Sequence, residues 1–262
     1  FKNLEVIYHD PNIPTVTPVE GKMNAGIAAA QDAAVAAFTA DPTPETYEAA
    51  LAAIAAAQES ADYYAPFAKA VESLDEAGAA KFAEAEIAAS YEAGTLDETT
   101  TEEITEALIA AEKAQTTPGS DLSLVVTSGT WVNQSGTYGG DPKCAERYSG
   151  SAYTGDADEP TKVMYQHIEG LQPGEYTVNY LATANMAWIG AATGEDIAQL
   201  FANDVTEDIE VIGQTACTIT DYPREQVVTV GEDGILEYGL QNVGTGGNWY
   251  VAKAISLTLN KL

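Results

Sequence analysis

The hydrophobic residues follow two different periods along the chain. Over residues 17–115 they recur at spacings of three and four, as on one face of an α-helix, and Val19, Met23 and Ile27 begin this pattern. Beyond residue 120 they alternate with other residues, which is typical of half-buried strands. The alternating positions include Leu122, Leu124 and Val126, and then Tyr176, Val178 and Tyr180. The two periods predict helices in the N-terminal part and strands in the C-terminal part.

Threonine–proline pairs mark the expected helix starts. Thr17-Pro18 and Thr43-Pro44 each place a capping side chain before a proline, which is well tolerated in the first turn of a helix. Short connections make successive helices antiparallel neighbours. We therefore expect residues 17–115 to form an alanine-rich, antiparallel helical bundle that acts as a spacer.

Turn-rich segments mark the remaining boundaries. Residues 1–16 contain prolines and are expected to be extended, and residues 116–120 (Thr-Thr-Pro-Gly-Ser) are expected to be a linker. About eight short strands separated by glycine-rich turns fill residues 121–262, a pattern that predicts an antiparallel β-sandwich of the jelly-roll type. The expected fold class is α + β with several domains.

The chain is strongly acidic, with 40 Asp and Glu residues against 11 Lys and Arg and a formal net charge of −29. This charge repels nucleic-acid phosphates and anionic lipids, whereas it is compatible with divalent cations and neutral ligands such as sugars. No segment approaches the roughly 20 apolar residues that span a membrane. We expect neither a nucleic-acid partner nor a membrane-spanning segment, and a chain that starts at Phe1 is expected to be processed or trimmed.

Residues that carry catalysis are scarce. The two histidines are His9, in the N-terminal segment, and His167, which we expect to be a packed or solvated residue of a strand. The sequence has no Gly-x-Ser-x-Gly, His-x-x-x-His or Cys-x-x-Cys motif. Cys144 and Cys217 either form a disulfide or remain separate thiols. We expect a protein that is not an enzyme.

One run of residues has a family resemblance. Val163 to Val178, with Tyr165-Gln166, Gly170-Leu171 and Gly174, resembles the core of galactose-binding-like jelly rolls of the carbohydrate-binding-module type. Asn248-Trp249 through Leu257 is similar to the closing strand of that family, although Lys253-Ala254 replaces its usual aspartate–asparagine pair. The helical part is loosely similar to FIVAR bundles. The resemblance covers about residues 120–260.

The resemblance implies a place at the cell surface. Such modules are common in the surface lipoproteins of Bacteroidetes, so the expected localisation is extracellular or on the outer cell surface. The lipid anchor would lie upstream of Phe1. The implied partner is a glycan or a glycoprotein, and an adhesive role is the alternative.

A sugar site needs aromatic rings that stack on the pyranose and amides that bind its hydroxyl groups. Residues of these types occur in the expected loops of the sandwich. For Trp131, packing in the core is the alternative to stacking on a sugar. For Trp188, the sequence supports packing in the core and stacking on a sugar equally. The candidate carbohydrate-binding residues are Trp188, Tyr153, Trp131, Tyr138 and Asn185.

A metal site is the second candidate. Galactose-binding-like domains often hold a structural calcium ion between loops, through carboxylates and backbone carbonyls. Asp156, Asp158 and Glu159 form a dense acidic turn that supplies such ligands, and a solvated loop is the alternative account. No other cofactor is expected.

Two functional hypotheses follow. The first is a non-catalytic surface protein that binds carbohydrate through loops of the sandwich. The second is a structural or adhesive protein that contacts host or neighbouring surface proteins without a sugar site. A solvent-facing aromatic ring beside polar groups would favour the first, whereas burial of the loop aromatics would favour the second.

Overall fold

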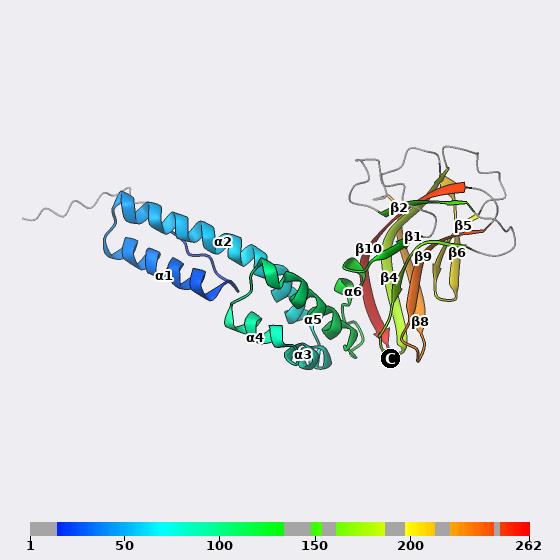
Figure 1. Cartoon of the computed structure of the whole chain (residues 1–262), viewed down its shortest axis with the longest axis horizontal. Helices are drawn as coiled ribbons and strands as arrows, with labels where there is room; N and C mark the ends of the chain where they lie inside the picture. Colours follow the sequence, from blue (N-terminus) through cyan, green and yellow to red (C-terminus); the bar gives the residue numbers. More distant parts are fainter. Residues whose placement is uncertain (1–14, 134–147, 154–160, 187–196, 213–220, 244–246) are drawn as a thin grey trace, which may run out of the picture. The chain divides into compact units, whose positions relative to one another are not determined.

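A computed structural model describes residues 15–133, 148–153, 161–186, 197–212, 221–243 and 247–262 (Figure 1). It confirms the coarse prediction of an α + β chain with helices in the N-terminal part and strands in the C-terminal part. The chain divides into two compact units. The first unit comprises Phe1–Glu72 and Ala85–Thr105, and the second comprises Ser73–Glu84 and Glu106–Leu262.

The first unit is helical. Its elements are α1 (Ala25–Ala40), α2 (Pro44–Ser73, whose last residue belongs to the second unit), α4 (Glu86–Ala93), the 3-10 turn η1 (Glu98–Thr100) and the start of α5 (Thr101–Lys113). The predicted start of a helix at Thr43-Pro44 is confirmed, because α2 begins at Pro44 and the Thr46 N–H donates to Thr43 Oγ1 over 3.2 Å.

The other predicted start, at Thr17-Pro18, is wrong. The first helix begins at Ala25, where the Asn24 side chain accepts hydrogen bonds from the N–H groups of Gly26 and Ile27. Upstream, the amide of the buried Gln31 binds both backbone groups of Val19, at 2.8 Å to its N–H and 3.1 Å to its carbonyl. These bonds replace the intrahelical ones, so the segment stays outside the helix.

The second unit contains two sheets. The first follows the order β1-β3-β9-β5-β6; in the second, β10 lies between β2 and β4, and β4 also pairs with β7 and β8. All pairs are antiparallel except the short β4–β7 pair. The strands are β1 (Trp131–Asn133), β2 (Tyr148–Tyr153), β3 (Thr161–Ile168), β4 (Gly174–Met186), β5 (Ile197–Ala202), β6 (Val205–Ile209), β7 (Val211–Ile212), β8 (Pro223–Val230), β9 (Leu236–Val243) and β10 (Gly247–Lys261).

Three buried tyrosines form part of the core of this unit, which draws on both sheets. Each hydroxyl donates to a side-chain amide oxygen, so the buried polar atom is satisfied. The donor–acceptor distances are 2.7 Å for Tyr180 to Gln226, 2.9 Å for Tyr238 to Gln166 and 2.5 Å for Tyr250 to Asn242. Burial raises the pKa of the Tyr180 and Tyr238 hydroxyls well above the ordinary value, so both remain neutral donors.

The second unit also holds α3 (Glu76–Ala83), the end of α5 and the short helix α6 (Ser123–Thr127). The strand predicted from Leu122, Leu124 and Val126 is therefore wrong. Two carboxylates stabilise the helix instead, because Asp121 Oδ1 accepts from the Ser123 N–H at 2.9 Å and Glu112 Oε2 accepts from the Val125 N–H at 3.0 Å. None of the described helices is both long and apolar enough to cross a membrane.

The predicted linker, residues 116–120, is bound along its length within the second unit. The Asp75 carboxylate caps α3 through the Gly78 N–H and accepts from the N–H groups of Thr116 and Thr117 at 2.7 and 2.8 Å. The Gly119 N–H donates to the carbonyl of Leu259 in β10 at 2.7 Å. The two compact units do not divide the chain at this segment.

We expect Asp75→Asn to destabilise the second unit by about 2 kcal/mol at pH 7. Partial burial alone would raise the pKa of Asp75, but the N–H groups of Gly78, Thr116 and Thr117 outweigh it and lower this pKa to about 2. The stabilisation is present above the unfolded-state pKa near 4 and is lost as the pH falls towards 2. Urea unfolding at pH 7 and at pH 2.5 measures it.

Glu76→Gln removes one exposed charge next to Asp75 and is the matched control. An Asp75→Asn variant with the unfolding free energy of the wild type at pH 7 would contradict the role assigned to this carboxylate.

Candidate functional site

Most of the predicted site residues lie outside the described part of the chain. Trp188 and Tyr138 belong to this group, as do the candidate metal ligands Asp156, Asp158 and Glu159. Tyr153 ends β2 opposite Gly247, and Asn185 lies in β4 opposite Trp249, but the side chains of Tyr153 and Asn185 are also outside the described part. Among the described residues no group of three or more His, Cys, Asp or Glu side chains is arranged to hold a metal ion.

Trp131 is the predicted site residue whose side chain is described. It is 7 % exposed and packs edge-on against Tyr238, with ring centroids 5.6 Å apart. It pairs with Gln166, whose side chain is buried, so both point to the core side of the sheet. The Trp131 ring is part of the core, and it is not an exposed platform.

The opposite side of the same sheet gathers aromatic, amide and charged residues. In β3, β9 and β5 the alternate residues Met164, Tyr238 and Leu200 point into the core, so their neighbours point outward. We call this surface the outer face. It consists of Lys162, Tyr165 and His167 of β3, Gln199 and Phe201 of β5, Asp208 of β6, and Glu237, Gly239 and Gln241 of β9.

An aromatic pair occupies the middle of the outer face. Tyr165 and Phe201 both lie opposite Gly239, and their ring centroids are 6.2 Å apart. The Lys162 ammonium lies 5.8 Å from the Tyr165 ring and 5.2 Å from the Phe201 ring, within cation–π range. Phe201 is 1 % exposed and Tyr165 is partly exposed, so Tyr165 is the ring that a ligand reaches.

Gly239 makes this arrangement possible. Its φ of +153° is rare for residues with a side chain, and a Cβ atom there would lie 2.7 Å from the Tyr165 Cα and even closer to the Met164 carbonyl oxygen. The backbones of β3 and β9 therefore approach more closely than a side chain would allow.

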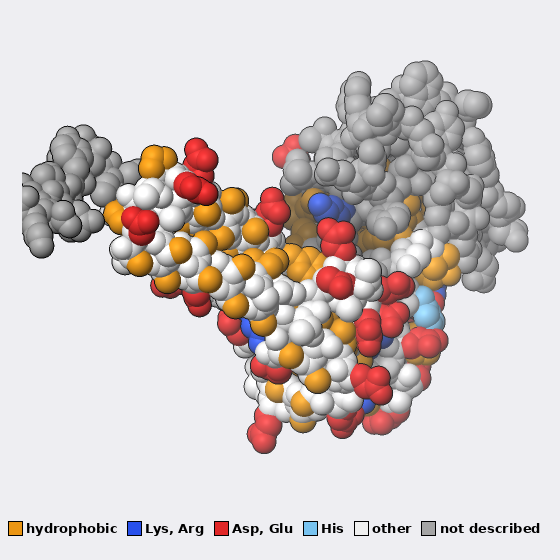
Figure 2. Space-filling model, turned by 60° about the vertical axis from the view of Figure 1, so that its left-hand side comes forward, with side chains coloured by type: hydrophobic (Ala, Val, Ile, Leu, Met, Phe, Trp, Pro, Cys, Tyr) orange, Lys and Arg blue, Asp and Glu red, His pale blue; other side chains and the backbone are white. Residues whose placement is uncertain are grey.

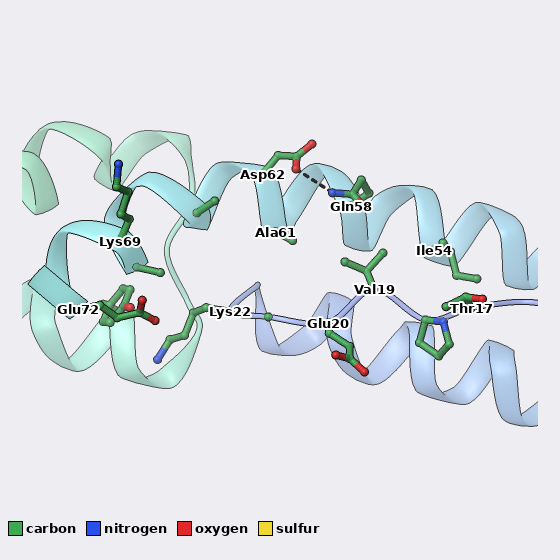
Figure 3. Close-up of a pocket in the computed structure, with 15 residues that line it drawn as sticks. Thr17, Val19, Glu20, Lys22, Ile54, Gln58, Ala61, Asp62, Lys69 and Glu72 are labelled. Carbon is green, nitrogen blue, oxygen red and sulfur yellow. Dashed lines mark hydrogen bonds between the residues drawn. The ribbon is translucent and has the colours of Figure 1, made fainter.

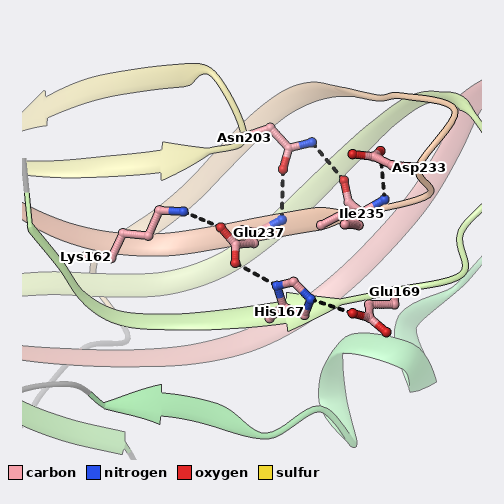
Figure 4. Close-up of polar contacts among 7 residues, drawn as sticks. All are labelled: Lys162, His167, Glu169, Asn203, Asp233, Ile235 and Glu237. Atoms are coloured by element: carbon pink, nitrogen blue, oxygen red, sulfur yellow. Dashed lines mark hydrogen bonds and ion pairs between the residues drawn. The ribbon is translucent and has the colours of Figure 1, made fainter.

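Lys162 also belongs to a charged cluster with Glu237, His167 and Glu169, which Figure 4 shows. Glu237 accepts from the Lys162 ammonium, and its Oε1 lies 2.6 Å from His167 Nδ1. The other ring nitrogen, Nε2, lies 3.0 Å from Glu169 Oε1. Hydrogen bonds to Glu237 and Glu169 raise the pKa of His167. Burial would raise the pKa of Glu237, but Lys162 and His167 lower it. This cluster was not predicted from the sequence, although the alternation of Tyr165 with His167 indicates that both lie on one side of a strand.

An amide row completes the outer face. Gln241 Nε2 donates to Gln199 Oε1 at 2.9 Å, and Gln199 Nε2 donates to Asp208 Oδ1 at 2.6 Å. Each bond fixes the orientation of the next side chain. Asp208 is exposed, and its carboxylate can accept further hydrogen bonds.

A groove in the first unit is a second candidate (Figure 3). It encloses about 810 Å³ between the extended residues 17–22 and one side of α2. Lys22 already binds Glu92 at 3.2 Å and lies 4.3 Å from the Tyr91 ring. The charges that line the groove are of both signs, on Glu20, Lys22, Asp62, Lys69 and Glu72, so the groove favours no particular ligand charge.

Comparisons with known proteins identify no family for this chain, and the solved structure described below is only distantly similar to it. No family model matches the chain, and no curated protein matches it. Among solved structures, a pentameric capsid protein isolated from metagenomic phage sequences is 15 % identical, with 40 % of this chain covered. The match covers 65 % of that protein, just under two thirds of its length, and has a TM-score of 0.18. A likeness this weak does not bear on fold or function.

Proposed function

We propose that this protein binds carbohydrate without catalysis, through the outer face of the sheet that contains β3, β9 and β5. In this proposal the two sheets form a sandwich of the jelly-roll type, similar to galactose-binding-like modules. The helices form a bundle that acts as a spacer at the cell surface.

The observation that carries the proposal is the combination of residue types on the outer face. The partly exposed Tyr165 ring offers an apolar surface on which a pyranose can stack. Beside it, Gln199 and Asp208 are already oriented by hydrogen bonds, with the buried Gln241 holding Gln199, so binding a hydroxyl group costs little further ordering. An aromatic ring beside an oriented amide and a carboxylate is the set of groups that sugar recognition requires.

The residues predicted from the sequence extend this proposal to the loops. Trp188, Tyr153, Tyr138 and Asn185 remain candidates for further sugar contacts. Asp156, Asp158 and Glu159 remain candidates for a structural calcium site. Burial of Trp131 favours the alternative of an adhesive protein without a sugar site, whereas the partly exposed Tyr165 beside polar groups favours carbohydrate binding.

A glycan array probed with the full chain tests the proposal. For a glycan that binds, we expect Tyr165→Ala to weaken the affinity by about 10- to 100-fold, because the stacking surface is removed. Tyr165→Phe keeps the ring and should retain most of the affinity. Isothermal titration with each variant measures the change.

The control is Val227→Ala, which changes a residue that is 49 % exposed on β8 of the other sheet. Its affinity should equal that of the wild type. An array with no bound glycan, or unchanged affinity in a folded Tyr165→Ala variant, would remove the outer face as a sugar site.

A further inference from the structure

The cations of the outer face are already paired with carboxylates. Among its described residues the basic side chains are Lys162 and His167. Glu237 binds both of them, at 2.6 Å from His167 Nδ1 and at contact distance from the Lys162 ammonium. Glu169 binds the remaining ring nitrogen of His167 at 3.0 Å. The Lys162 ammonium also lies over the Tyr165 and Phe201 rings. A ligand that drew this ammonium away would therefore break its contacts with both rings and with Glu237.

The acidic groups of the face are less completely neutralised. Asp208 is exposed, and its described partner is the neutral amide of Gln199. Acidic side chains also outnumber basic ones over the described surface in Figure 2, in line with the formal net charge of −29. A carboxylate or sulfate group on a ligand would meet a negative potential here, and at Lys162 it would compete with the Glu237 carboxylate that already pairs with the ammonium.

Hydroxyl groups face no such obstacle. Gln199 and Asp208 offer an amide and a carboxylate that can bind a diol, and neither has to break an ion pair to do so. The aromatic ring of Tyr165 stacks on a neutral sugar without any charge requirement.

We propose that the outer face selects neutral glycans and discriminates against uronic, sialylated or sulfated ones, with Glu237 as the residue that sets this preference by occupying Lys162. The inference rests on the proposed function, because it concerns the ligand class of the same site. Glu237 is a specificity-determining residue in this proposal.

The first test uses matched ligands on one array: neutral oligosaccharides, and the same backbones carrying a uronic acid, a sialic acid or a sulfate. For a neutral glycan that binds, we expect its acidic counterparts to bind at least about 10-fold more weakly in 150 mM NaCl, because both cations among the described residues of the face are already paired with carboxylates.

The second test is a gain of function. Glu237→Gln releases Lys162 from its ion pair, so the affinity for the acidic counterpart should rise about 5-fold or more relative to that for the neutral glycan. Glu169→Gln is the matched control, because it removes one negative charge from the same cluster and leaves the Lys162–Glu237 pair intact. Its neutral-to-acidic affinity ratio should stay close to the wild-type ratio. Circular dichroism of each variant verifies the fold.

The outcomes separate the inference from the proposed function. If no glycan binds, carbohydrate binding itself is wrong. If glycans bind but acidic ones bind as well as neutral ones, the site stands and the selectivity is wrong. If Glu237→Gln and Glu169→Gln shift the ratio equally, general electrostatics explains the preference and the role of Glu237 is overturned.

Discussion

Gly239→Ala is expected to destabilise the second unit by more than about 3 kcal/mol, the largest effect that we expect from adding a single methyl group. The new Cβ atom would lie 2.7 Å from the Tyr165 Cα, a clash with the backbone of β3 that no side-chain rotation can relieve. The φ of +153° adds backbone strain for alanine. Since β9 lies inside its sheet, between β3 and β5, the strain acts on a central strand.

Urea unfolding measures this loss, and Gly231→Ala is its matched control. At Gly231 the nearest atom to a new Cβ is Asp233 Oδ1 at 3.4 Å, which is ordinary packing distance, so little change in stability is expected. Equal stabilities of the two variants would show that β3 and β9 can separate at Gly239 without cost, contrary to the structure.

The second large effect is a dependence of the unfolding free energy on pH, which arises from Glu112. This side chain is 3 % exposed, and burial, with the nearby Asp121 charge, raises its pKa to about 7 even though the Val125 N–H donates to it. The folded-state pKa therefore lies above the ordinary value of 4.5. The folded protein binds more protons than the unfolded chain between these values, so stability falls as the pH rises from about 4.5 to 7.

Integrated over this pH range, the loss of unfolding free energy amounts to about 3 kcal/mol. We expect Glu112→Gln, which stays neutral, to lack this decline and to be more stable than the wild type at pH 8. Unfolding free energies at pH 5, 6, 7 and 8 give the comparison. Glu106→Gln, at an exposed position of the same helix, should follow the wild-type curve. Parallel curves for Glu112→Gln and the wild type would refute the shifted pKa.

The order of helices and strands could be predicted from the sequence because hydrophobic periodicity reports directly on local structure. The alternation at Tyr176, Val178 and Tyr180 falls within β4, and all three side chains are buried. The prediction was wrong where side chains from elsewhere replaced local bonds. Gln31 holds Val19 out of a helix, and Glu112 stabilises a helix at Val125 where alternation predicted a strand.

The outer face could be predicted only in part. The alternation of Tyr165 with His167 shows that they share one side of a strand, and a glycine inside a strand, such as Gly239, indicates a close approach of backbones. The neighbours of Tyr165 across the sheet depend on the register of β3 with β9 and of β9 with β5. Register is set by packing of the whole unit, so Phe201 and Gln199 could not be assigned to the site from the sequence.

The position of β10 has a consequence for how the chain folds as it is synthesised. Among the described strands this one is synthesised last, yet it lies between β2 and β4 and pairs with both. The edges of β2 and β4 that pair with β10 therefore stay unpaired until residues up to Lys261 have been synthesised. The helices of the first unit can form much earlier. Exposed edges in a nascent chain invite aggregation, and the high negative charge opposes it by keeping neighbouring nascent chains apart.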